Sequence, residues 1–363
     1  RLQRLRESQA DLRAARALAE AAGDRRRAAE LLLEEATALD WLEDFPASAA
    51  AAARAAELCA GLGDARLDAR CLLASGRSDC RGQRVDGGIP KLEQAARGAL
   101  ALGDHEAHVI ARLLLVGSLS VAGRLDEAER HGEAVVDACL RAGDVFHLCA
   151  AYINRLFMWV KRRDEGRALE DQREAVRLAR ELGHAQLERW ATLNLSELRY
   201  WMGALDEALP LARRCLDLQR RFFNQRPSPD DALLLARIHL ARGEHDEAAR
   251  HLAEARASVP DIDLTPCART LARLVHQALD DRPAGRFDAA AWRALVQEAR
   301  HTAILHEHAE ALHTAVLSAL RAGAAGEALV FLEEARAVSA GFWERRFDEL
   351  ERALLAPGAT ATA

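Results

Sequence analysis

Two short sequence patterns, which we call marks, recur at steps of forty residues. This period constrains the fold of the chain more than any other feature. The first mark is a glycine followed by a polar residue, and it recurs at Gly23, Gly63, Gly103, Gly143 and Gly183. The second mark falls about halfway between, as "GRLDEA" from position 123, "GALDEA" from 203 and "GEHDEA" from 243. A fixed period of this length is typical of repeat architectures, in which each unit packs mainly against its neighbours.

Both marks carry residues that separate helices. A glycine after an apolar run supplies the left-handed residue that ends a helix, and an aspartate directly after it can accept hydrogen bonds from the next helix. In "LDEA" we expect the aspartate to cap a helix again, with the glutamate close to its positive N-terminus. Between the marks, Ala128, Val135 and Cys139 follow helical spacing. Each unit is therefore predicted to be two antiparallel helices of roughly fifteen to eighteen residues.

The sequence predicts an all-α fold, an α-solenoid of about eight helix hairpins. We expect a leading helix over about 1–22, a trailing helix over about 341–355, and a single solenoid over residues 1–355. The register weakens after Phe223, where "FFNQRPSPDD" replaces the Gly-Asp turn, so a seam is possible at 222–231. The composition of 356–363, "APGATATA", predicts a disordered tail or linker.

Charge and cysteine usage exclude several classes of partner. The chain has 50 basic and 56 acidic residues and a net charge of −6, and arginine alternates with glutamate along the predicted helices. A nucleic-acid partner would require a basic stripe, so we expect none. No apolar run reaches about eighteen residues, so we expect no membrane insertion. Seven scattered cysteines without a CxxC pair favour a reducing, cytoplasmic compartment.

The pattern resembles the tetratricopeptide repeat over essentially the whole chain. Asn154 and Asn194 fall where that family often carries asparagine in the first helix. The family's small residue in the second helix is matched by Ala128, Ala168, Ala208, Ala248 and Ala328. The usual period is 34 residues, and a closing proline is replaced here by glycine. The forty-residue variant is similar to arrays in maltose-activator-like regulators, kinesin light chains and bacterial kinase–ATPase fusions.

This resemblance implies a right-handed superhelix in which the first helix of each hairpin lines a concave groove. The groove-facing positions of the family correspond here to Arg77, Arg81, Phe157, Lys161, Trp190, Glu197, Tyr200, Trp201 and Arg237. Aromatic residues and arginine are common anchors in interfaces, which favours a binding site. Each helix must also bury one stripe of side chains, so packing within the hairpins is the alternative explanation of the aromatic cluster.

The sequence offers no catalytic motif. It contains neither a phosphate-binding P-loop nor a nucleophile elbow. His306, Glu310 and His313 share one helical face, but the two histidines are about 10 Å apart along the axis, too far for one zinc ion. We interpret this face as a polar helix surface, and we expect no catalytic residue, no metal and no cofactor.

The leading functional hypothesis is a non-enzymatic scaffold or sensor that binds a protein or peptide in its groove. Because the sequence opens without methionine, we expect it to belong to a larger bacterial regulatory or signalling protein. The alternative is a domain gated by a small molecule that controls an attached ATPase or kinase. A P-loop or kinase motif before Arg1 would favour the alternative. The sequence leaves the partner's identity and the oligomeric state open.

Overall fold

The computed structural model is all-helical in every part of the chain that it describes, as the repeat predicts. It describes residues 5–42, 44–82, 84–222, 228–259, 264–281, 286–302, 306–338 and 341–355. Eighteen helices lie in these ranges. None of them is long and apolar enough to cross a membrane. The predicted tail at 356–363 lies outside the described residues.

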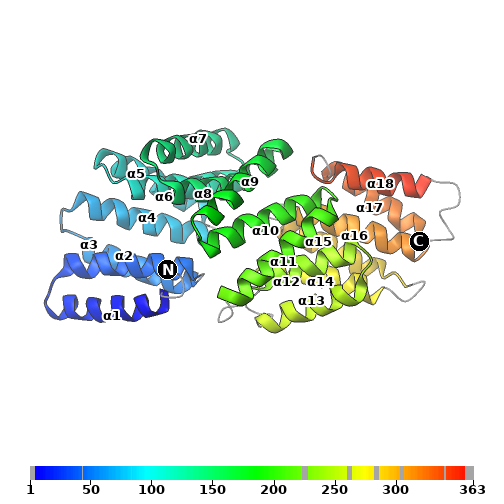
Figure 1. Ribbon diagram of the computed structural model, residues 1–363, viewed down its shortest axis with the longest axis horizontal. Coiled ribbons are helices and arrows are strands. Elements are labelled where there is room, and N and C mark those ends of the chain that lie inside the picture. Colours follow the sequence, from blue (N-terminus) through cyan, green and yellow to red (C-terminus); the bar gives the residue numbers. More distant parts are fainter. Residues whose placement is uncertain are drawn as a thin grey trace. The chain divides into compact units, whose positions relative to one another are not determined.

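The helices fall into two compact units, residues 1–162 and 163–363 (Figure 1). Unit 1 holds α1 (Leu5–Ala21), α2 (Arg25–Trp41), α3 (Phe45–Cys59), α4 (Ala65–Arg81), α5 (Val85–Ala101), α6 (His105–Val121), α7 (Leu125–Ala142) and α8 (Val145–Arg162). Unit 2 holds α9 (Glu165–Glu181), α10 (Ala185–Trp201), α11 (Leu205–Phe222), α12 (Pro229–Ala241), α13 (His245–Ser258), α14 (Pro266–Asp280), α15 (Ala289–Thr302), α16 (Glu307–Arg321), α17 (Ala325–Val338) and α18 (Glu344–Leu355).

The forty-residue step is confirmed across both units. Helices α2, α4, α6, α8 and α10 begin forty residues apart, and so do α3, α5, α7, α9 and α11. From α12 to α17 the helices shorten to between 13 and 15 residues, which matches the looser register of the sequence. The proposed seam at 222–231 includes 223–227, which lie outside the described residues. Unit 2 instead begins at Arg163, and a single solenoid over 1–355 stays a prediction.

The two marks end helices in the same way but begin them differently. Gly103 and Gly123 both have left-handed backbone, with φ of +66° and +75°. At the first mark, Asp104 caps α6 by accepting the Ala107 N–H. At the second mark the expected aspartate cap is wrong, because Arg124 is the N-cap residue of α7 and makes no side-chain cap bond. Asp126 lies in the first turn of α7 instead, where its charge complements the helix dipole.

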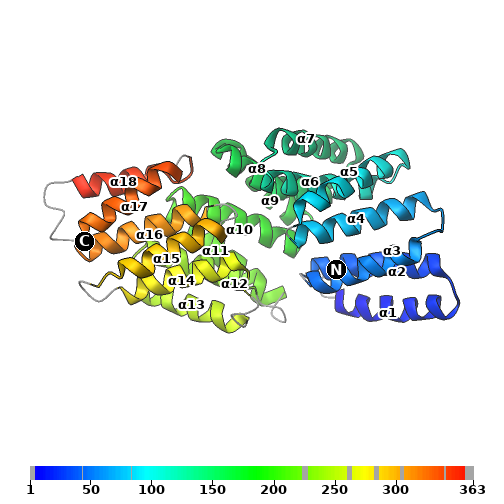
Figure 2. The same ribbon diagram turned by 180° about the vertical axis from the view of Figure 1, so that it is seen from behind.

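The helices of each unit form two layers (Figure 2). Even-numbered neighbours within a unit contact one another and form what we call the inner layer. Odd-numbered helices pack on the even-numbered ones and form the outer layer. The five repeated alanines are fully buried, and the Ala208 carbonyl accepts a bond from Ser196 of the facing helix α10. Small residues at this position therefore allow the two helices of a hairpin to approach closely.

Candidate binding surface

The inner layer of unit 2 closes around a buried carboxylate on α16. Glu310 is 1% exposed, and the Arg237 guanidinium on α12 reaches it through Nε at 2.8 Å and through Nη2 at 2.5 Å. The Tyr200 hydroxyl on α10 donates to the same carboxylate at 2.8 Å. Glu197 accepts a further bond from Arg237 Nη1 at 2.9 Å, and burial raises the pKa of Glu197. The charges of this face are therefore matched from within the unit.

Aromatic side chains extend this closure toward α18. The Tyr200 ring meets Trp343 edge to face, with the centroids 6.0 Å apart, and the Arg346 guanidinium lies 5.1 Å from the Tyr200 centroid. Trp201 is 2% exposed and packs against His306 and Phe342. Tyr200 and Trp201 thus agree with the packing alternative, because their rings fill the interior of unit 2. As exposed groove residues they are wrong predictions, and Trp190 on α10 is half-buried.

The expectation of a polar helix surface at the start of α16 is also wrong. Glu310 and His313 are buried, and His313 lies against the rings of Trp343 and Phe347. Burial, together with the charge of Arg346, holds the pKa of His313 well below its usual value. The helical face is polar, but it turns toward the inner layer and α18 because the chain brings α18 against α16.

Unit 1 has an arginine, Arg77, at the position equivalent to Arg237, and this arginine has no close carboxylate like Glu310 among the described residues. Arg77 on α4 lies four periods before Arg237 and is 6% exposed. Its Nη1 is 3.5 Å from the Thr37 hydroxyl, its Nε is 3.9 Å from Asp40 Oδ1, and that Nε has no hydrogen-bond partner among the described residues. Burial lowers the pKa of Arg77, which Asp40 only partly offsets. This guanidinium is therefore poorly satisfied, which is unusual for a buried charge.

The surroundings of Arg77 along the inner layer are more open than those of Arg237. Arg81 is exposed, bonds Asp40 through Nε at 3.2 Å and lies over the Phe45 ring. The next positions in the same register are Gly117 on α6 and Phe157 on α8. A Cβ added at Gly117 would meet no heavy atom within 4 Å. Phe157 is half-buried and Lys161 is exposed.

A separate pocket lies between α5, α6 and α7 of unit 1. Its volume is about 310 Å³, and its lining residues are Glu93, Ala96, Arg97, Leu100, His108, Arg112 and His131. Arg112 donates through Nε to His108 at 3.0 Å and through Nη1 to His131 at 3.4 Å. No carboxylate of the described residues pairs with Arg112.

Burial lowers the pKa of both histidines of this pocket, which favours their neutral forms. His108 Nδ1 donates to the Ala96 carbonyl at 2.9 Å, which leaves Nε2 to accept from Arg112. Burial and the neighbouring Arg112 charge lower the pKa of His131 to about 4. The pocket therefore holds one unmatched positive charge, while Glu93 at its edge pairs with the Arg97 and Arg124 guanidinium groups.

Sequence reasoning missed the residues that decide how each arginine is matched. Glu310 is 73 residues from Arg237, and local spacing carries no signal for such a pairing. The unmatched state of Arg77 had a weak signal, since the register places Thr37, Gly117 and Phe157, none of them acidic, at the equivalent positions of unit 1. The residues around Arg112 come from three helices, and no local pattern in the sequence predicts the pocket that they form.

No protein-family model matches the sequence, and no curated protein matches it. Solved structures do match at the level of the fold. A Rap protein complexed with Competence and Sporulation Factor is 14% identical with a TM-score of 0.64, over 95% of this chain and 99% of that one. Aspartyl phosphate phosphatase F from Bacillus subtilis is 12% identical with a TM-score of 0.61, over 100% and 93%. The chain thus has a tetratricopeptide-like helical-repeat fold.

Proposed function

We propose that this protein is a non-enzymatic helical-repeat module that binds a peptide segment carrying a carboxylate. The observation that carries the proposal is Arg77, a buried guanidinium on the inner layer whose Nε has no hydrogen-bond partner and whose one carboxylate neighbour among the described residues, Asp40, is 3.9 Å away and also pairs with Arg81. In unit 2 the equivalent arginine is satisfied by Glu310. A partner's acidic side chain or C-terminus would supply in unit 1 what Glu310 supplies in unit 2. Charge-assisted bidentate bonds to arginine are among the strongest polar contacts in proteins.

The neighbouring residues suit the rest of such a segment. Phe157 offers a half-buried aromatic ring, and the space beside Gly117 leaves room for a side chain of the partner. Arg81 and Lys161 add exposed positive charge. Of the groove positions that the sequence predicted, we therefore retain Arg77, Arg81, Phe157 and Lys161 as contacts. Trp190, Glu197, Tyr200, Trp201 and Arg237 support the fold of unit 2 in this proposal.

The fold comparison is compatible with a binding role. One protein of this fold was solved in complex with Competence and Sporulation Factor. The resemblance to maltose-activator-like regulators and bacterial kinase–ATPase fusions further supports a place within a larger bacterial regulatory or signalling protein, which is part of the proposal.

A random peptide library panned against the full chain tests the proposal. We expect enrichment of peptides with an acidic residue or a free C-terminus beside an apolar one. Arg77→Gln should weaken the binding of the selected peptides by about 1.5–3 kcal/mol, the range for hydrogen bonds to charged groups. Calorimetry measures this change. Arg130→Gln, the same charge change on an exposed part of outer helix α7, is the matched control. Peptides that bind wild type and Arg77→Gln equally well would refute the proposed anchor.

The pocket around Arg112 favours a second candidate function, a domain gated by a small anionic molecule that controls an attached ATPase or kinase. Its volume suits a small ligand, and Arg112 would pair with the ligand's carboxylate or phosphate group. Thermal-shift measurements with a panel of small carboxylates and phosphates test it. A stabilising ligand whose effect disappears in Arg112→Gln supports the candidate. No stabilisation by any member of the panel counts against it.

A further inference from the structure

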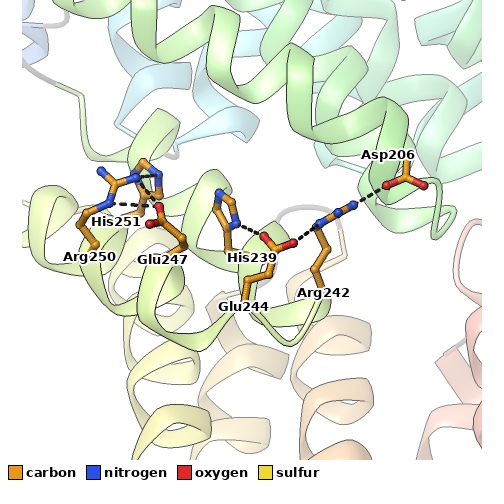
Figure 3. Close-up of polar contacts among 7 residues, drawn as sticks. All are labelled: Asp206, His239, Arg242, Glu244, Glu247, Arg250 and His251. Atoms are coloured by element: carbon orange, nitrogen blue, oxygen red, sulfur yellow. Dashed lines mark hydrogen bonds and ion pairs between the residues drawn. The ribbon is translucent and has the colours of Figure 1, made fainter.

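Two histidines and a glutamate converge on the hairpin of α12 and α13 in unit 2 (Figure 3). His239 lies near the end of α12. Glu247 and His251 lie four residues apart on α13, so they share one face of that helix. One potential ligand atom from each of the three residues lies within 4.8 Å of the others. Neither the proposed peptide surface nor the pocket involves these residues.

The two imidazole rings are held in place by burial and stacking. His239 is 2% exposed and His251 is 5% exposed. Their ring centroids are 5.4 Å apart and their planes differ by 11°. Glu247 is half-exposed, so its carboxylate can move toward the rings at little cost. The cluster thus combines two fixed nitrogen donors with one adjustable oxygen donor.

Each imidazole is oriented by a glutamate on its other nitrogen. His239 Nδ1 donates to Glu244 Oε2 at 2.5 Å, and His251 Nδ1 donates to Glu254 Oε2 at 3.3 Å. This arrangement leaves Nε2 of both rings unprotonated, as the atom that can accept a bond or coordinate a metal. Histidines that bind metals characteristically donate their second ring N–H to a carboxylate in this way, which fixes the tautomer and increases the basicity of the coordinating nitrogen.

The contacts that orient the His239 ring extend to helix α11 of the outer layer. Glu244 accepts a bond from Arg242 Nε at 2.8 Å, and Arg242 also pairs with Asp206 of α11 (Figure 3). Asp206, Arg242, Glu244 and His239 therefore form a continuous chain of charge-assisted contacts. Such a chain restrains the ring of His239 more firmly than burial alone.

A positive charge already occupies the space beside His251 and Glu247. Arg250 Nη2 donates to His251 Nε2 at 2.8 Å and to Glu247 Oε2 at 2.5 Å. A single cationic group is thus bound by two members of the cluster at once. The Arg250 side chain is 55% exposed, so it can rotate into solvent and free both atoms.

We propose that His239, Glu247 and His251 form a binding site for a divalent transition-metal ion of the Zn²⁺ class, which displaces the Arg250 guanidinium. Two imidazoles and a carboxylate are a donor set that zinc accepts, and three protein ligands leave a fourth position for water. Imidazole donors favour zinc, copper and nickel over magnesium and calcium. The alternative occupant is Arg250 itself, in a purely structural network of charges.

Zinc titration of the chelator-treated full chain, in competition with a chromophoric chelator, distinguishes these explanations. We expect one zinc ion per chain. Glu247→Gln and His251→Gln should each weaken zinc binding at least tenfold, because even the loss of a residue that supports a metal ligand has an effect of about this size. Glu247 is half-exposed, so its variant keeps the test valid if His251→Gln fails to fold. Arg250→Gln should bind zinc several-fold more tightly than wild type, because the competing cation is gone. His276→Gln, an exposed histidine on α14, should leave the affinity unchanged.

Cobalt substitution identifies the ligands independently of the variants. Cys59 and Cys71 of unit 1 place their sulfur atoms 2.8 Å apart and are the obvious competitor for a soft metal. A cobalt complex at the proposed site should lack the near-ultraviolet charge-transfer band of thiolate ligands. A thiolate band, zinc affinity that is unchanged in Glu247→Gln and His251→Gln, or no zinc binding by wild type would overturn the proposal.

Discussion

Arg77 and Arg237 occupy equivalent positions in the two units, and their partners differ. Each lies four residues before the end of an inner-layer helix, α4 or α12. Arg237 is clamped by Glu310 and Glu197, and both ends of the Arg237–Glu310 pair are buried. Arg77 is equally buried, yet its polar contacts among the described residues are with Thr37 at 3.5 Å and Asp40 at 3.9 Å. The same residue at the same position is thus closely paired in one unit and only weakly paired in the other.

This difference separates what the repeat determines from what it leaves free. The contact between the two helices of a hairpin is constant, since Ala128 in unit 1 and Ala208 in unit 2 are both fully buried. The inner layer is variable, because its residues face other repeats. A buried charge that the chain itself does not match is expected where binding, not folding, maintains the residue.

The largest effect should come from removing the matched arginine. Arg237→Met leaves Glu310 buried without its cation, and we expect a loss of about 3–5 kcal/mol of stability. Urea unfolding followed by circular dichroism measures it. The double variant Arg237→Met with Glu310→Leu should recover much of the loss, because it removes both buried charges. If Arg237→Met alone were as stable as wild type, the Arg237–Glu310 pair would not stabilise unit 2.

A smaller loss of stability, equal in the two units, should follow from enlarging the repeated alanine of a hairpin. Ala128→Leu and Ala208→Leu each insert a larger side chain between the helices of a hairpin, and we expect each to cost about 1–3 kcal/mol through overpacking. Thermal melting of the two variants checks this. Leu329, an exposed residue of α17, offers a control, since Leu329→Ala should leave the melt unchanged. A large difference between the two alanine variants would mean that hairpin packing is not conserved between the units.

A smaller effect is expected where unit 2 begins. Arg163 occupies the position that Gly123, Gly203 and Gly243 fill elsewhere, and its φ of +60° is left-handed like theirs. Arg163→Gly should relieve this strain and stabilise the protein by about 0.5–1 kcal/mol, less than the full left-handed penalty because glycine also loosens the unfolded chain. Gly123→Ala is the reciprocal variant and should destabilise. A lower melting temperature for Arg163→Gly would contradict this explanation.

The sequence was sufficient to predict the helices but not the surfaces. Periodic glycines and aspartates act within one or two turns of the chain, so most helix boundaries followed from local chemistry. The burial of Trp201 depends on His306 and Phe342, more than one hundred residues away. The match between Arg237 and Glu310 likewise depends on how several repeats curve. Such contacts leave no local pattern, so the sequence could not decide between a groove and packing for the aromatic positions of unit 2.

We infer that Arg77 is kept for a partner and not for the fold, and the stability of Arg77→Met is the measurement that separates the two roles. Removing a buried charge without a good match should leave stability within about 1 kcal/mol of wild type or increase it. The same variant should lose affinity for acidic peptides. Urea unfolding of Arg77→Met beside Arg237→Met provides the measurement. An unchanged or higher midpoint for Arg77→Met is the result expected if Arg77 serves binding. A loss as large as that of Arg237→Met would show that Arg77 is structural and would contradict this inference.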